Sequence, residues 1–225
     1  MNVAPTQEPR TSKYAQEGSF AHFVAEKILR DELFFEPTRQ TFDGQQHVIT
    51  PELIETLRPY TESARKMIED PNMVCGIELG VVVPGTGNQV YGTTDFAAFS
   101  AVGSVLVIMD LKFGSGVKVD ADTPQTALYA LGTAAMFDVK SADTVIQRVI
   151  VQPRGSDTLN PIRTATTTLG ELREWFDDCV TPAIRDINAG DIAENPGNWC
   201  QFCPRKMDCR AKRSASVLKA FENLP

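Results

Sequence analysis

The stretch VLVIMDLKFGSG, from Val105 to Gly116, decides the fold because an apolar run continues directly into two opposite charges. Consecutive apolar residues bounded by glycines predict a strand with both faces covered. Side chains alternate along a strand, so Asp110 and Lys112 project to the same side, about 6.6 Å apart along the chain. The two charges therefore lie either in water at the end of the strand or, if buried, beside a partner or a metal ion that compensates them.

Two more strand-like segments precede this one, MVCGIELGVVV at 73–83 and NQVYGTTDFAAFS at 88–100. The turn-rich sequences PGTG and AVGS connect the three segments, which predicts an antiparallel β-meander. A further strand is predicted in DTVIQRVIVQPRG, which Pro153 and Gly155 close.

Helical periodicity surrounds these strands. It predicts helices in 17–33 with Ser19 as N-cap, in 50–69 with Pro59 kinking or dividing the helix, in 123–137, and in 167–190 with a break near Pro182. This order of elements predicts an α/β (α+β) fold, in which helices flank a mixed sheet.

The register of the last hairpin brings two acidic residues together. If Val102 and Gly103 form a two-residue turn, Asp95 lies directly across from Asp110. Paired residues have Cβ atoms about 4.5–5.5 Å apart, and like charges there repel each other unless a cation lies between them. Carboxylate oxygens favour Mg²⁺ or Mn²⁺. A longer loop at 101–104 would shift the register, and a slip of one residue would turn one aspartate to the opposite face.

These residues resemble the signature of the PD-(D/E)XK nucleases. Asp95 is followed fifteen residues later by the triplet at 110–112, Asp-Leu-Lys. His22 on an early predicted helix, and Gln125 and Tyr129 in PQTALYA, are similar to the motif histidine and the Q-x-x-x-Y motif of the RecB-like branch. The resemblance, which covers roughly residues 15–212, implies the restriction-endonuclease-like core of that superfamily.

The resemblance also implies a division of roles at a catalytic metal site. Asp95, Asp110, the backbone carbonyl of Leu111 and His22 would hold Mg²⁺ or Mn²⁺, which polarises the scissile phosphate and acidifies a bound water. Lys112 would orient that water and stabilise the charge that develops on the phosphate. The alternatives for His22 and Tyr129 are an ordinary satisfied histidine and ordinary core packing. Glu26 and Glu78 are interpreted as solvated or supporting residues.

Nucleic-acid contacts are expected from two places. Gln125 and Tyr129, four residues apart on one helix face, would position the DNA backbone or a nearby base. Between residues 200 and 219 six Lys or Arg stand against one acid, although the chain as a whole carries a net charge of −7. Arg205, Lys206 and Arg210 in this basic tail are candidates for phosphate contacts, and a solvated helix face is the alternative.

Three cysteines in CQFCPRKMDC have the spacing of metal ligands: Cys200, Cys203 and Cys209. They are similar to the C-terminal cysteines of RecB-like nucleases with a [4Fe–4S] cluster, among them AddB and the CRISPR-associated adaptation nucleases; zinc is the alternative. The fourth ligand is unidentified, because residues 1–21 contain no cysteine. Cys75 or Cys179 could be recruited, but both are also interpretable as core cysteines.

The predicted organisation is a flexible N-terminus at 1–14, a nuclease core at 15–194 and a cysteine-rich basic segment at 195–225, called the cysteine segment below. We expect a cytoplasmic protein without a membrane span, encoded by a phage and acting in a bacterial host. The expected activity is metal-dependent DNA hydrolysis during recombination or end processing, with exonuclease action on double-stranded ends or single strands favoured over internal cleavage. A recombinase or annealing protein is the candidate protein partner. The alternatives are an inactive DNA-binding or assembly module and a zinc-stapled protein–protein adaptor.

Overall fold

A computed structural model describes residues 13–32, 39–115, 117–155, 157–190, 194–197, 199–200 and 203–214. The chain forms two compact units, Met1–Asp178 and Cys179–Pro225. The predicted boundary between residues 194 and 195 lies inside the second unit. No helix among the described residues is both long enough and apolar enough to cross a membrane.

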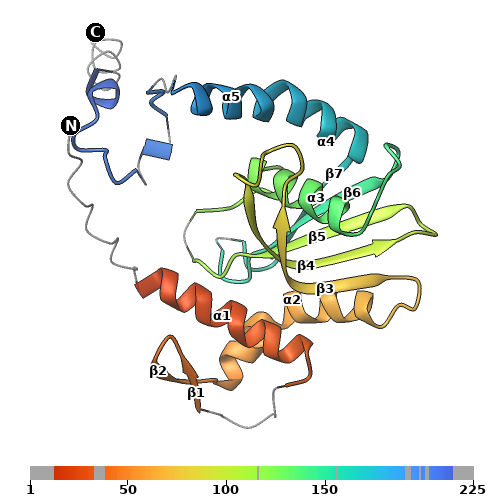
Figure 1. The fold of residues 1–225 in the computed structure, drawn as a ribbon. Coiled ribbons are helices and arrows are strands. Elements are labelled where there is room, and N and C mark those ends of the chain that lie inside the picture. Colours follow the sequence, from red (N-terminus) through yellow and green to blue (C-terminus); the bar gives the residue numbers. More distant parts are fainter. Residues whose placement is uncertain are drawn as a thin grey trace. The chain divides into compact units, whose positions relative to one another are not determined.

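The first unit is built on a five-stranded sheet with the order β3-β4-β5-β6-β7 (Figure 1). The strands span Val74–Val82 (β3), Tyr91–Ser100 (β4), Val105–Leu111 (β5), Val145–Val151 (β6) and Ile162–Thr168 (β7). Neighbouring strands are antiparallel except β5 and β6, which are parallel. The structure therefore confirms the predicted meander and the mixed sheet flanked by helices, and it adds β7, which was not predicted.

Helices cover both faces of this sheet (Figure 1). The helices α1 (Lys13–Leu29) and α2 (Pro51–Ile68) form a core with one face, and α3 (Pro124–Met136) and α4 (Leu169–Trp175) form a core with the other. In β5, Val107 and Met109 belong to the α1–α2 core, whereas Leu106 and Ile108 belong to the α3–α4 core. The prediction that this strand is covered on both faces is confirmed.

Two details of the first helices differ from the prediction. Ser19 is not an N-cap, because α1 already begins at Lys13; the preceding Ala15, Gln16 and Glu17 are good helix formers, which continue the helix upstream. The helix α2 begins as predicted, with the Thr50 side chain accepting a hydrogen bond from the Leu53 amide, but it is one element through Pro59. Its buried apolar face outweighs the missing amide: Leu57, Tyr60 and Ala64.

A small hairpin between α1 and α2 was not predicted. The strands β1 (Arg39–Phe42) and β2 (Gln45–Val48) are joined by Asp43 and Gly44, both with positive φ, 50° and 71°. This is the geometry that an Asp-Gly turn favours. The strands are short and polar, so they lack the apolar alternation by which strands are recognised.

The second unit contains α5 (Thr181–Ala189), which Gly190 ends in the left-handed conformation. Before it in the chain, Phe176–Val180 forms a single π-helical turn, η1. The predicted interruption of this helical region is present, and Pro182 lies in the first turn of α5, where its missing amide costs no hydrogen bond.

Candidate metal centre

Glu78 marks the point where β3 changes the face to which its side chains point. Ile77 pairs with Phe96 and Leu79 pairs with Thr94, so Glu78 lies opposite Asp95. Residues two apart on a strand normally share a face, yet Ile77 packs against the α1–α2 core and Leu79 against the α3–α4 core. Glu78 has φ +51°, which is a strained conformation for a non-glycine residue. Such strain is frequent at functional sites.

The predicted register of the next hairpin is confirmed. Ser100 pairs with Val105 and Phe96 with Met109, which makes Asp95 and Asp110 the next opposed residues. The paired residues of β4 and β5 end at Phe96 and Met109. Beyond this pair the two strands are connected by a side chain, because Asp95 Oδ2 accepts a hydrogen bond from the Leu111 amide at 2.7 Å. Three acidic residues therefore form a row across the adjacent strands β3, β4 and β5.

His22 on α1 reaches this row. Its Nδ1 lies 3.4 Å from Asp95 Oδ1 and 3.9 Å from Glu78 Oε1. One potential ligand atom from each of His22, Glu78 and Asp95 lies within 4.8 Å of the other two. Among the described residues, this is the one group of three or more His, Cys, Asp or Glu side chains that is close enough to hold a metal ion. We call His22, Glu78, Asp95 and Asp110 the carboxylate cluster.

The protonation of His22 reflects the surrounding negative charge. Burial disfavours the charged imidazolium, but the hydrogen bonds and charges of Asp95 and Glu78 outweigh it and raise the pKa of His22 from 6.5 to about 10. In the metal-free protein the imidazolium thus neutralises part of the cluster. A metal ion that binds through His22 must displace this proton.

Asp110 is the most buried member of the cluster, with 3% of its surface exposed. The Lys112 ammonium lies 2.7 Å from Asp110 Oδ2, but not in a hydrogen-bonding direction, so this buried oxygen has no hydrogen-bond partner among the described residues. Burial and the Asp95 charge raise the pKa of Asp110 from 3.8 to about 6, against the opposing effect of Lys112. The Asp110 carboxylate is therefore a buried oxygen ligand that is ion-paired with Lys112, and carboxylate oxygens suit a hard divalent cation.

A chain of hydrogen bonds leads from Lys112 to α3. Its ammonium donates to Gln125 Oε1 at 3.1 Å, and the Gln125 amide nitrogen donates to the Tyr129 hydroxyl at 3.2 Å. The Thr123 side chain caps α3 and fixes its start, which places Gln125 in the first turn and Tyr129 one turn later on the same side. The structure therefore brings the predicted residues Lys112, Gln125 and Tyr129 together.

Glu78, interpreted from the sequence as a solvated or supporting residue, lies in the candidate ligand group with His22 and Asp95. The sequence does contain a signal for it. Glu78 is the one charge in the apolar run MVCGIELGVVV, between two glycines. Glu26, by contrast, pairs with Arg30 one turn along the same helix, at 2.9 Å.

The three cysteines of the cysteine segment lie farther apart than the ligand atoms of His22, Glu78 and Asp95. In the described part of the chain, the sulfurs of Cys200, Cys203 and Cys209 do not form a group of three within ligand distance. Cys200 Sγ accepts a hydrogen bond from the Gly197 amide, and Cys209 Sγ lies 3.7 Å from a Glu194 carboxylate oxygen. Three basic side chains of this segment are exposed: Arg205, Lys206 and Arg210.

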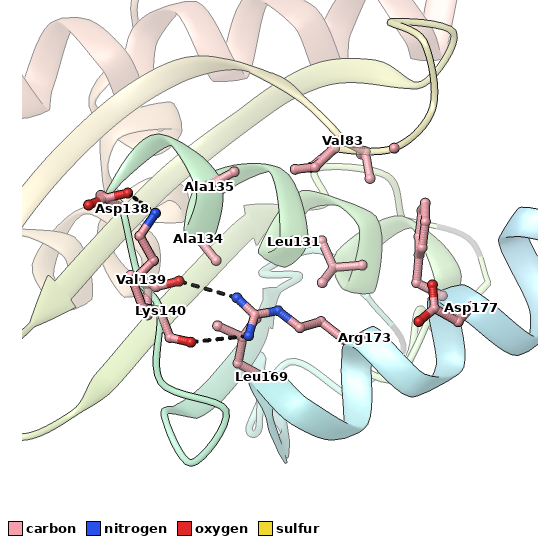
Figure 2. Close-up of a pocket in the computed structure, with 13 residues that line it drawn as sticks. Val83, Leu131, Ala134, Ala135, Asp138, Val139, Lys140, Leu169, Arg173 and Asp177 are labelled. Carbon is pink, nitrogen blue, oxygen red and sulfur yellow. Dashed lines mark hydrogen bonds and ion pairs between the residues drawn. The ribbon is translucent and has the colours of Figure 1, made fainter.

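A cavity of about 480 Å³ lies elsewhere in the first unit, between α3 and α4 (Figure 2). Its wall includes the apolar residues Leu131 and Leu169, and the Arg173 guanidinium donates to the carbonyls of Val139 and Lys140. The Arg173 guanidinium thus holds the loop after α3, and no member of the carboxylate cluster lines this cavity. We therefore place the candidate site at the cluster.

Comparison with known proteins assigns the family. The model of the family described as "Protein of unknown function (DUF2800)" matches residues 2–223, and the chain belongs to this family. Among solved structures, "Crystal structure of SSO0001" is 14% identical with a TM-score of 0.30, over 87% of this chain and 98% of that one. A likeness at this level carries no argument about fold or function, so the function is argued from the residues.

Proposed function

We propose that this member of the DUF2800 family is a metal-dependent nuclease that hydrolyses DNA phosphodiester bonds. One observation carries the proposal: a histidine and three acidic residues from four different elements converge beside a lysine that is hydrogen-bonded in place. Three acidic residues this close, two of them buried, destabilise a folded protein unless cations compensate them, and His22 and Lys112 compensate two of the three charges. Such a cluster is therefore better explained by a function than by stability.

The donor set fits Mg²⁺ or Mn²⁺. His22, Glu78 and Asp95, whose ligand atoms lie within 4.8 Å of one another, would hold the ion. Asp110 is not in that group, and the resemblance to PD-(D/E)XK nucleases adds it together with the Leu111 carbonyl. When bound, the ion would polarise the scissile phosphate and lower the pKa of a coordinated water. Glu78 would be a ligand in addition to the four that the resemblance implies: His22, Asp95, Asp110 and the Leu111 carbonyl.

Lys112 would be the residue that acts on the reacting groups. Its ammonium is held between Asp110 and Gln125, so it is pre-positioned rather than mobile. There it would orient the attacking water and stabilise the negative charge that builds up on the phosphate oxygens. Gln125 and Tyr129 would fix this position and contact the DNA backbone nearby.

The resemblance supports the more specific part of the proposal. It places the chain with RecB-like, phage-encoded enzymes that process DNA ends in the bacterial cytoplasm, together with a recombinase or annealing protein. The cysteine segment would carry a [4Fe–4S] cluster or zinc, and Arg205, Lys206 and Arg210 would contact phosphates. Digestion from ends would dominate over internal cleavage.

The test is digestion of linear and circular DNA with Mg²⁺ or Mn²⁺ by the wild type and by Lys112→Ala. We expect the variant to lose about 100-fold or more in rate, the typical effect of removing a group that stabilises transition-state charge. Lys66→Ala is the matched control, because Lys66 is an exposed lysine on α2 and should keep full activity.

Two outcomes separate the alternatives. A wild type that is inert with both metals on every form of DNA contradicts the proposal. If that protein still binds DNA in a salt-dependent manner, the inactive DNA-binding module is the better description. If it contains zinc and has no affinity for DNA, the protein–protein adaptor is favoured.

A further inference from the structure

Gln152, the residue that follows β6, is 2% exposed and binds the connection between β5 and α3. Its amide nitrogen donates hydrogen bonds to the carbonyl oxygens of Gly114 and Val117, at 3.2 and 3.1 Å. Its amide oxygen accepts hydrogen bonds from the Val119 amide at 3.1 Å and from the Arg163 guanidinium at 2.6 Å. A glutamine side chain offers two N–H donors and two acceptor sites, so these four bonds use the full hydrogen-bonding capacity of Gln152.

These partners also determine the orientation of the Gln152 amide group. Two of them are carbonyl oxygens, which only accept, and the other two are N–H groups, which only donate. Gly155 packs directly on the amide, because a Cβ atom there would come within 3.0 Å of Gln152 Cδ. A buried polar group whose bonds are all made rigidifies its surroundings. Gln152 therefore holds the connection in one conformation at the points that it contacts.

The residue before Gln152 holds Lys112. The Lys112 amide, the first beyond β5, donates a hydrogen bond to the Val151 carbonyl at 2.8 Å. Gln152 then binds the carbonyl of Gly114, two residues beyond Lys112. The side chain of Phe113, which lies between these two contacts in the chain, is buried in the α1–α2 core. The backbone that carries the Lys112 side chain is therefore held at Lys112 and immediately after it.

We propose that Gln152 is a positioning residue for Lys112, which it holds at the carboxylate cluster by fixing the chain at Gly114. The inference rests on the proposed nuclease function and adds to it a residue that does not contact the reacting groups. Gln152 carries no charge, so it acts on the position of the Lys112 ammonium and not on the electrostatic field around it. Position alone matters greatly, because a displacement of about 1 Å can cost about 100-fold in rate.

The experiment measures kcat and KM for digestion of linear DNA with Mg²⁺ by the wild type and by Gln152→Ala. We expect kcat to fall about tenfold or more and KM to change less than about threefold, because the displaced lysine acts in the transition state. The rise in melting temperature on adding Mn²⁺ should stay within about 1 °C of the wild-type value, because Gln152 is not a metal ligand.

A second background separates positioning from a general structural defect. In Lys112→Ala, the substitution Gln152→Ala should change the residual rate less than about twofold, because residues that act as a unit have non-additive effects. A substitution that merely loosened the fold would lower the rate by the same factor in both backgrounds.

Two further variants serve as controls. Gln152→Glu leaves no cavity and can still accept from Val119 and Arg163, but an ionised carboxylate cannot donate to Gly114, so kcat should fall here as well. Gln147→Ala alters a half-buried glutamine on β6 and should keep the wild-type kcat.

Wild-type kcat in both Gln152 variants, or an equal loss of rate on Gln152→Ala in the two backgrounds, would overturn the positioning role. If the wild type meanwhile cleaves DNA with Mg²⁺, the proposed function survives and only this role is wrong. If Gln152→Ala does not fold, Gln152→Glu in the same two backgrounds decides the question. If the wild type is inert with Mg²⁺ and Mn²⁺, the proposed function fails and the positioning role fails with it.

Discussion

The carboxylate cluster of the first unit and the cysteine segment of the second are both rich in metal ligands, but they are held in different ways. Glu78, Asp95 and Asp110 lie on three adjacent paired strands, so the backbone register aligns them. In the cysteine segment, local contacts such as the hydrogen bond from the Cys203 amide to the Cys200 carbonyl are the main restraint. The first site is formed by the sheet, whereas the second depends on short-range contacts.

This difference shows where ligand geometry comes from. A site that the core imposes exists without its ion, at the cost of repulsion among buried charges. A site on a short irregular segment generally acquires its geometry from the metal, because binding and folding are coupled there. We therefore expect the two regions to respond differently to metals and to substitutions.

The largest expected difference is in stabilisation by Mn²⁺. An ion at about 100 times its dissociation constant stabilises the folded state by about 2.7 kcal/mol, which corresponds to roughly 5–10 °C in melting temperature for a unit of this size. Glu78→Gln keeps the size of the side chain but removes a charged ligand, so this shift should fall by roughly half or more. Thermal denaturation at increasing Mn²⁺ concentrations measures it.

The matched control for this prediction is Glu26→Gln. Glu26 lines the same groove as His22 and Glu78 but pairs with Arg30, so its loss should leave the Mn²⁺ shift intact. A Glu78→Gln protein with the full shift would remove Glu78 from the ligand set and restore its interpretation as a supporting residue.

The sheet around the cluster was largely predictable, because its strands are apolar runs with strong turn signals. Val102 and Gly103 gave the correct turn, and the turn fixed the register that opposes Asp95 and Asp110. Polar elements were missed for the converse reason. The strands β1 and β7 have sequences RQTF and IRTATTT, whose few apolar residues do not identify them as strands.

The composition of the site was predictable in part. The turn register placed Asp95 and Asp110 together and strand alternation added Lys112, whereas His22 was added by the resemblance to the nuclease motifs. Glu78 is marked by its charge in an apolar run, but its direction could not be predicted, because strand alternation gives no warning of the positive φ at which β3 changes face. That change depends on how two cores pack against one sheet, which is a property of the tertiary structure.

A smaller effect is expected from the charge of Asp110 in the metal-free protein. Because burial and Asp95 raise its pKa from 3.8 to about 6, the folded state favours the neutral carboxyl. This contribution to stability is fully present below pH 3.8 and is lost as pH rises through about 6. Asp110→Asn removes the charge, so it should stabilise the metal-free protein by about 1–2 kcal/mol at pH 8 and by about half as much at pH 5, where the contribution is already partly lost.

Urea denaturation in the presence of EDTA at the two pH values measures this difference. Asp120→Asn is the control, because Asp120 is an exposed aspartate in the loop after β5 and should show no such pH dependence. If Asp110→Asn destabilises the protein equally at both pH values, the charge of Asp110 is not a cost to folding, and the argument that the cluster requires a cation loses its main support.

The smallest effect is expected from Cys203→Ser, and it tests the comparison from the other side. All members of the carboxylate cluster belong to the first unit, so the variant should keep the Mn²⁺-induced rise in melting temperature within about 1 °C, less than the effect of 1 kcal/mol on a unit of this size. Iron and zinc content, measured by mass spectrometry on protein purified without oxygen, should nevertheless fall relative to the wild type. Loss of the Mn²⁺ response on Cys203→Ser would show that the two ligand-rich regions are coupled, because a substitution in one would then change the metal affinity of the other.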